Sequence, residues 1–234
     1  MHIKVILFII TAVTAVLGHV EITQPCPRYS NKCATTPELP PGEVIDYNLN
    51  APIGSNGNIL APFCHHTTPW PQPTETWTAG QPVTFKFYKP VATTHHGGHC
   101  EFSIMYPNCT TYLVLHQELR YCFYTGPPDN GGQDTVREYT FNLPTDLPGT
   151  PHAVAAWTFV NSVGAREFYA LCGDIAVIGP AGALTGKAVT IVNYGSNTVL
   201  IPEFLGNYDT GISYYTTNTT NVTVVGEGYG GYLG

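Results

Sequence analysis

Apolar and polar residues alternate over short stretches of this chain, and no window has an apolar stripe at helical spacing. Residues 83–87 alternate as a half-buried β-strand should. Residues 153–160 form a more continuous apolar run, which is expected of a strand covered on both faces. Further β-rich runs occupy residues 82–88, 100–106, 111–116, 139–143, 168–171 and 174–178, and residues 188–192 and 198–201 could add two more.

Turn residues separate these runs. The chain has 20 prolines and 24 glycines, and strands of this length between turn signals predict an all-β fold. We expect an immunoglobulin/fibronectin-III-like β-sandwich with long loops, stapled by disulfides. Residues 19–80 are mostly irregular, and a loop segment of this length usually carries function or is pinned by cross-links.

The first 18 residues are predicted to be a secretory signal peptide. They combine a basic start at Lys4, an apolar run over residues 5–17 and a small residue, Gly18, at the end. The run is too short for an ordinary membrane span. We therefore expect a secreted, extracellular protein with no membrane partner, with the β-sandwich in residues 19–182 and a C-terminal extension or tail in residues 183–234.

Charge and cysteine content narrow the classes of partner. Nine Lys and Arg stand against 16 Asp and Glu, which argues against nucleic acid as a partner and is compatible with a neutral polymer. Seven cysteines follow the signal, so disulfides are expected and one cysteine has no partner within the chain. Candidate glycosylation acceptors are Asn108, Asn218 and Asn221.

His19 gives the sequence its most specific chemistry. Cleavage after Gly18 would make His19 the first residue of the mature chain. Its free α-amino group and its imidazole would then offer a metal two nitrogens, whereas the backbone nitrogen of an internal histidine is an amide. A second imidazole would complete three nitrogens in a T, an arrangement that suits Cu(II) because this ion prefers tetragonal nitrogen donors. The sequence thus predicts a site for one copper ion.

The second imidazole has two neighbouring candidates, His95 and His96. They open the densest histidine cluster, His95-His96-Gly97-Gly98-His99-Cys100, between two predicted strands. The glycines would let this backbone approach a surface closely. We favour His95 because Cys100 anchors the register, and a one-residue slip turns a side chain to the opposite face.

Three segments together resemble a lytic polysaccharide monooxygenase, and they are most similar to auxiliary activity family eleven, the fungal chitin-active type. The segments are His19-Val20-Glu21-Ile22, His95 five residues before Cys100, and residues 161–172, which read Asn-x-x-Gly-x-Arg-Glu-x-Tyr-x-x-Cys. The resemblance implies that His19 and His95 bind copper and that Tyr169 takes the axial position. It also implies that Glu167 is the acid beside the metal.

Strand alternation supports this arrangement independently of the resemblance. Glu167 and Tyr169 are two residues apart, so in a β-strand both side chains face the same way.

The resemblance also implies a disulfide framework. The first pair expected is Cys64 with Cys172, which would tie the long N-terminal loop to the strand that carries Tyr169. Cys26 would pair with Cys33, and Cys100 with either Cys122 or Cys109.

The function implied is oxidative cleavage of glycosidic bonds in a crystalline β-linked polysaccharide by a monomeric enzyme. Chitin is the first expectation for the substrate and cellulose or another glucan the second. The enzyme would use O₂ or H₂O₂ together with an external electron donor. Two alternatives stay open: a secreted copper-binding protein of the same fold without polysaccharide oxidation, in copper acquisition or signalling, and a module that only adheres to chitin.

The first residue of the secreted protein is the first test. Because a terminal amine is needed beside the ring, N-terminal sequencing of the secreted chain is expected to read His-Val-Glu-Ile from His19. Any other first residue would remove the two-nitrogen ligand on which the copper site depends.

Overall fold

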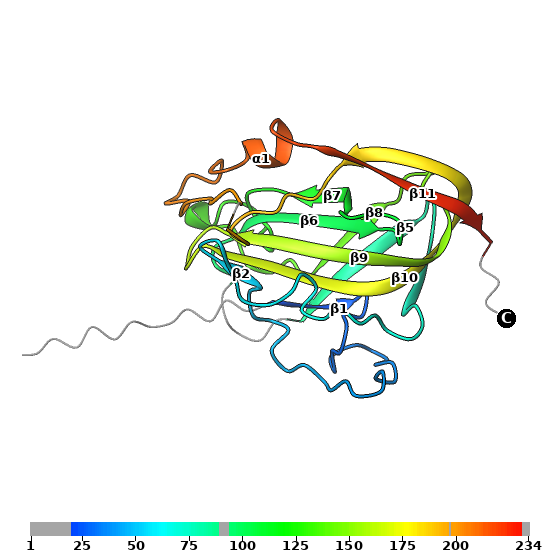
Figure 1. Ribbon diagram of the computed structural model, residues 1–234. Helices are drawn as coiled ribbons and strands as arrows, with labels where there is room; N and C mark the ends of the chain where they lie inside the picture. Colours follow the sequence, from blue (N-terminus) through cyan, green and yellow to red (C-terminus); the bar gives the residue numbers. More distant parts are fainter. Residues whose placement is uncertain (1–19, 89–93, 197, 231–234) are drawn as a thin grey trace, which may run out of the picture.

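The computed structural model describes residues 20–88, 94–196 and 198–230 and shows a β-sandwich (Figure 1), which confirms the predicted fold class. The smaller sheet has the order β1-β5-β8, and the larger has the order β3-β2-β10-β9-β6-β7, with β4 and β11 also pairing with β10. The smaller sheet consists of β1 (Glu21–Gln24), β5 (Pro82–Tyr88) and β8 (Glu138–Asn142). The larger sheet contains β2 (Gly54–Ser55), β3 (Asn58–Ile59), β4 (Glu75–Thr78), β6 (Gly98–Met105), β7 (Leu113–Glu118), β9 (Thr150–Asn161), β10 (Glu167–Lys187) and β11 (Asn221–Tyr229).

The strands from β5 to β10 lie where the apolar pattern predicts strands, whereas β1 to β4 lie in the stretch expected to be mostly irregular and β11 lies in the expected C-terminal extension or tail. Two of the predicted runs also differ in detail. The runs at 168–171 and 174–178 belong to one strand, β10, because Cys172 and Gly173 between them stay paired with Ala156 and Ala155 of β9. Residues 188–192 and 198–201 form isolated bridges rather than strands. They pack through Val192 and Ile201 onto a sheet face, and tertiary contact of this kind overrides local β-propensity.

Alternation along β9 and β10 sorts their side chains into two cores. Phe159 and Tyr169 point between the two sheets, where they belong to the main aromatic core. Val160 and Phe168 point to the outer face of the larger sheet and form a second cluster. The strand pattern therefore predicts which residues share a face, because successive side chains of a strand point to opposite sides.

The second cluster is covered by the C-terminal segment, residues 188–220, which contains the short helix α1 (Ser213–Thr216). Glu101 of β6 is fully buried beneath this segment and binds Lys187 Nζ at 2.5 Å and the backbone N–H of Thr190 at 2.6 Å. The buried carboxylate thus has the paired, hydrogen-bonded surroundings that a charge requires in a protein interior.

The expected boundary at residue 182 falls inside β10. This strand continues to Lys187, and its residues 179–187 pair with β11, as the long curved ribbon of Figure 1 shows. Residues 183–196 and 198–230 include β11, which pairs with β10, and side chains that pack on the outer face of the larger sheet.

Three disulfides staple the fold. The structure joins Cys26 to Cys33, Cys64 to Cys172, and Cys100 to Cys122, so Cys122 rather than Cys109 is the partner of Cys100. The resemblance implies the first two pairings, and for Cys100 it leaves Cys122 and Cys109 open. Cys109 is the free cysteine among the described residues and is half-buried beside β11.

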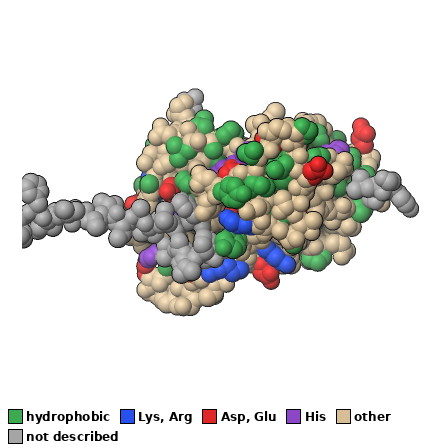
Figure 2. Space-filling model, turned by 90° about the horizontal axis from the view of Figure 1, so that it is seen from below, with side chains coloured by type: hydrophobic (Ala, Val, Ile, Leu, Met, Phe, Trp, Pro, Cys, Tyr) green, Lys and Arg blue, Asp and Glu red, His purple; other side chains and the backbone are tan. Residues whose placement is uncertain are grey.

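The charged side chains on the surface agree with the small number of Lys and Arg residues in the sequence. On the face seen in Figure 2, the few Lys and Arg side chains lie among polar and acidic ones rather than in a basic patch. The candidate acceptors Asn108, Asn218 and Asn221 are exposed. Within the described ranges, no helix is long and apolar enough to cross a membrane.

The disulfide between Cys64 and Cys172 should matter most for stability, because it spans 108 residues whereas Cys26–Cys33 spans 7. Replacing both cysteines of the long pair by alanine is expected to lower the free energy of unfolding by about 4–5 kcal/mol in the chain-entropy picture. The same change in the short pair should cost about 2 kcal/mol. Urea unfolding of both variants measures the difference, and equal losses would contradict the assignment.

Candidate copper site

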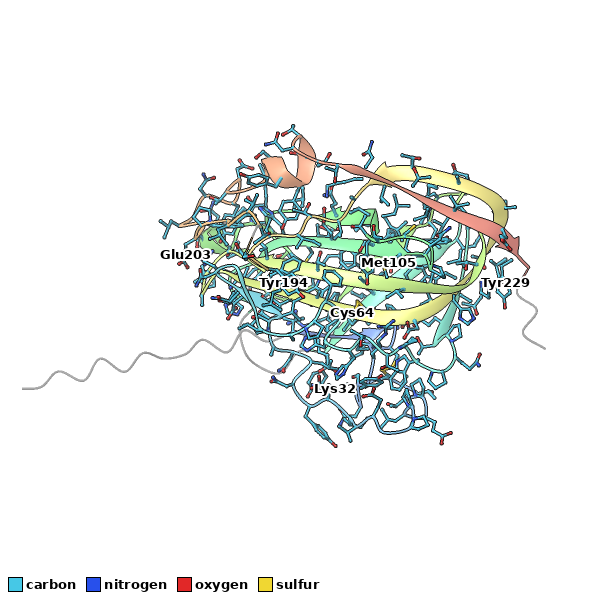
Figure 3. The ribbon with its side chains drawn as sticks, viewed as in Figure 1. Lys32, Cys64, Met105, Tyr194, Glu203 and Tyr229 are labelled. Atoms are coloured by element: carbon cyan, nitrogen blue, oxygen red, sulfur yellow. A yellow bond between two sulfur atoms is a disulfide. The ribbon has the colours of Figure 1, made fainter. Side chains whose placement is uncertain are left out.

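The candidate site lies at the end of the sandwich where β9 finishes and β10 begins. The two strands pair as Phe168 with Val160 and Tyr169 with Phe159, and residues 162–166 form the connecting loop. The His95 segment lies against this loop, because the backbone N–H of Val163 donates to the carbonyl of His95 at 3.2 Å. Figure 3 places Glu203, which contacts the same loop, at the end of the molecule opposite Tyr229.

Three of the predicted site residues meet here. His95 Nε2 lies 3.3 Å from the hydroxyl of Tyr169 and 3.2 Å from Glu167 Oε2. The Tyr169 hydroxyl donates to Glu167 Oε2 at 2.7 Å, so both side chains share one face of β10, as their spacing predicts. An imidazole, a phenol and a carboxylate therefore converge within hydrogen-bonding distance of one another.

Tyr169 keeps its proton in these surroundings. Its side chain is buried, and burial raises the pKa of its hydroxyl well above the usual value. The negative charge of Glu167 and the hydrogen bond to that carboxylate raise the pKa further, because each disfavours a second negative charge. The residue at the predicted axial position is consequently a neutral phenol.

Asn161, the last residue of β9, organises this cluster, and the sequence alone assigns it no role of its own. Its Nδ2 donates to Glu167 Oε2 at 3.1 Å, and its Oδ1 accepts the backbone N–H of Glu167 at 3.1 Å. Asn161 therefore fixes both the start of β10 and the orientation of its first carboxylate. The signal that could have found it is its place at the head of the Asn-x-x-Gly-x-Arg-Glu segment.

His95 and His96 are both in the left-handed backbone region, with φ of 49° and 56°. This conformation costs a residue other than glycine about 1–3 kcal/mol and persists only where neighbours hold it. The left-handed backbone directs the two side chains differently. His95 is 3% exposed and faces Tyr169, whereas His96 is exposed. His95 is thus the histidine of this pair that reaches the cluster.

Ser162 stabilises the left-handed backbone at His95 and His96 through hydrogen bonds. Its hydroxyl contacts the carbonyl oxygens of His95 at 2.8 Å and His96 at 2.9 Å, and its N–H donates to the carbonyl of Gly97 at 2.9 Å. Three successive carbonyls are therefore held by one residue of the β9–β10 loop.

His99 is directed elsewhere. The N–H of Arg120 donates to its Nδ1 at 3.0 Å, so Nε2 carries the proton and donates to the carbonyl of Thr210 at 3.0 Å. Burial lowers the pKa of His99 to about 4. It is a neutral residue that links β6 to the C-terminal segment.

His19 lies outside the described residues. The described chain begins at Val20, which belongs to the same core cluster as Tyr169, and Glu21 follows as the first residue of β1. Across residues 20–88, 94–196 and 198–230, no three His, Cys, Asp or Glu side chains form a group able to hold a metal ion. A metal site at His95 would accordingly need a ligand from another position.

Comparison with known proteins identifies the class of protein that this fold and cluster define. The chain is 33% identical over 180 residues to an AA11 family lytic polysaccharide monooxygenase A from Aspergillus fumigatus (strain CBS 144.89 / FGSC A1163 / CEA10), covering 76% of this chain and 73% of that protein. No family model matches the sequence.

Solved structures similar to this chain are also polysaccharide monooxygenases. A cellulose-active enzyme from M. thermophila matches at a TM-score of 0.44 and 13% identity, covering 71% of this chain and 79% of that one. An AA10 lytic polysaccharide monooxygenase from Streptomyces lividans matches at a TM-score of 0.30 and 18% identity, covering 46% and 59%.

The sequence relation decides the family: the chain belongs to the AA11 family of lytic polysaccharide monooxygenases. It is therefore an enzyme of the copper-dependent oxidoreductase class.

Gly164 has no room for a side chain. Its φ is 125°, and a Cβ atom there would lie 2.9 Å from Asn161 Nδ2 and 2.9 Å from His95 Nδ1. Gly164→Ala is therefore expected to lower the melting temperature by several degrees, in the range for a loss of about 1–2 kcal/mol. Differential scanning calorimetry measures it against Gly126→Ala, where a Cβ meets no atom within 4 Å. Equal melting temperatures for the two variants would contradict this packing.

Proposed function

We propose that this protein is a secreted, monomeric monooxygenase that holds one copper ion and cleaves an insoluble β-linked polysaccharide by oxidation, with chitin as the first substrate. The observation that carries the proposal is the convergence of His95, Tyr169 and Glu167 at the end of the β9–β10 hairpin. Membership of the AA11 family gives this cluster its chemistry.

The donor set fits copper. His95 offers an imidazole nitrogen, and His19 would add an amino nitrogen and a second imidazole, which are the nitrogen donors that Cu(II) prefers. Bound copper would supply the redox chemistry by which O₂ or H₂O₂, with electrons from an external donor, oxidises a C–H bond beside the glycosidic linkage.

The protein residues around the metal would control protons and water. Glu167 Oε2 accepts from Tyr169 and Asn161, so its carboxylate is held in one orientation and can take or return a proton at that oxygen. Tyr169 is buried and keeps its proton, so it would exclude water from its side of a metal held at His95 and present a neutral oxygen. His95 is held by backbone contacts and so needs little rearrangement on binding metal.

An exposed polymer suits this surface. A crystalline polysaccharide cannot enter a cleft, and it is neutral, which agrees with a chain that carries a modest net negative charge and no basic patch on the face in Figure 2. We name chitin first by the resemblance of the motifs and cellulose or another glucan second.

A second candidate is a copper-binding protein without polysaccharide oxidation. The carboxylate of Glu167, 3.2 Å from His95 Nε2, is compatible with either candidate, because the resemblance to the monooxygenases also implies an acid beside the metal. The buried phenol of Tyr169, whose hydroxyl lies 3.3 Å from His95 Nε2, favours the enzyme.

The test uses the two adjacent histidines as a matched pair. Copper-loaded mature protein with β-chitin and ascorbate is expected to release oxidised oligosaccharides, seen by mass spectrometry, only when ascorbate is present. His95→Asn should lose copper binding in calorimetry and all products, whereas His96→Asn should keep both, because Asn tolerates the left-handed backbone at either position.

Other results would overturn the proposal. Tight copper binding without products on chitin or cellulose would establish the second candidate. Polymer binding that is indifferent to copper would leave an adhesion module. Loss of copper from His96→Asn with retention in His95→Asn would exchange the roles of the two histidines.

A further inference from the structure

The loop between β9 and β10 is held from two sides. On one side, Ser162 and Val163 bind the backbone of His95, His96 and Gly97 through the hydrogen bonds described above. On the other side, the C-terminal segment reaches the same loop, although it is some 40 residues away in sequence. The loop therefore lies between the proposed copper ligand and a part of the chain that the site motifs do not include.

Glu203 makes the most specific of these outer contacts. Its Oε1 accepts the backbone N–H of Gly164 at 3.0 Å and lies 3.4 Å from the guanidinium Nη2 of Arg166. Arg166 Nη2 also donates to the carbonyl of Gly164 at 2.5 Å. Both polar groups of Gly164 are thus satisfied by one ion pair.

Phe204, the next residue in sequence, anchors the backbone beside Glu203. Its backbone N–H donates to the carbonyl of Ser162 at 3.1 Å, and its ring is buried against the outer face of the larger sheet. The ring also lies 5.0 Å from that of His99, which the same segment holds through Thr210. The backbone next to Glu203 is therefore held by the buried ring and the hydrogen bond of Phe204.

The loop has little freedom to relax inward, because Gly164 is already packed against the ring of His95 and the amide of Asn161. A shift of Gly164 would be passed directly to these two side chains, since close-packed atoms transmit strain.

We propose that Glu203 is a positioning residue of the copper site: through Gly164 and Arg166 it holds the β9–β10 loop, and through that loop it fixes His95. This inference rests on the proposed function. It assigns the C-terminal segment a part in metal binding, beyond its part in covering the sheet.

The experiment compares Glu203→Ala, Glu203→Gln and a control, Asp209→Asn. Asp209 belongs to the same segment and forms a surface ion pair with Arg120, so it matches the lost charge without touching the loop. Glu203→Ala is expected to weaken Cu(II) affinity in calorimetry by about 10-fold and to shift the copper electron paramagnetic resonance spectrum. Glu203→Gln keeps an oxygen for Gly164 and should restore most of both, and the control should match the wild type.

Hydrogen exchange of the copper-free protein gives a readout that does not depend on metal. Backbone amides of residues 94–98 and 161–166 should exchange about 5-fold faster in Glu203→Ala, the effect of losing roughly one hydrogen bond. A merely structural role would lower the melting temperature and leave the copper spectrum unchanged.

The outcomes separate the two proposals. A wild-type copper spectrum and affinity in Glu203→Ala would overturn the inference and leave the proposed function standing. Unchanged exchange at residues 94–98 would overturn it whether or not copper binds. A wild-type protein that takes up no copper would overturn the proposed function.

Discussion

The register between β9 and β10 is the constraint on which this site depends. Pairing Tyr169 with Phe159 directs Tyr169 and Glu167 to the side of His95, and it sends Phe168 to the opposite face, where it joins the second apolar cluster. A slip of one residue would bury a carboxylate in that cluster and remove the phenol from the site. Asn161 opposes such a slip because it binds both the backbone and the side chain of Glu167.

Local patterns in the sequence predict the parts of the structure that depend on neighbours along the chain. Strand positions follow from apolar alternation, and the shared face of Glu167 and Tyr169 follows from their two-residue spacing. Two of the disulfides needed the family resemblance in addition, because spacing alone leaves several pairings possible, and the partner of Cys100 needed the structure.

The remaining features depend on contacts across the fold and have no local signal. Ser162 and Glu203 are ordinary polar residues in the sequence, and only the return of the C-terminal segment to the β9–β10 loop gives them their contacts. The extent of β10 was underestimated for the same reason, since Cys172 and Gly173 look like a break but are held by pairing with β9.

The histidine cluster illustrates how the fold divides similar residues. His95 faces the candidate site, its neighbour His96 is exposed, and His99 is a buried neutral residue whose pKa burial lowers to about 4. The register to Cys100 favours His95 over His96 in the sequence, but no local signal shows that His99 is buried away from the site. Two left-handed residues at 95 and 96 turn the backbone between these environments, and hydrogen bonds from Ser162 and Val163 to this backbone stabilise the turn.

The course of β10 beyond residue 182 has a practical consequence for recombinant production. A chain shortened to residues 19–182 would end partway along a strand and leave the apolar outer face of Val160 and Phe168 open to solvent. It would also strip Lys187 and Thr190 from the buried carboxylate of Glu101. Exposed apolar surface and an unpaired buried charge both favour aggregation, so insoluble material from such a fragment would report on its missing strand rather than on its chemistry.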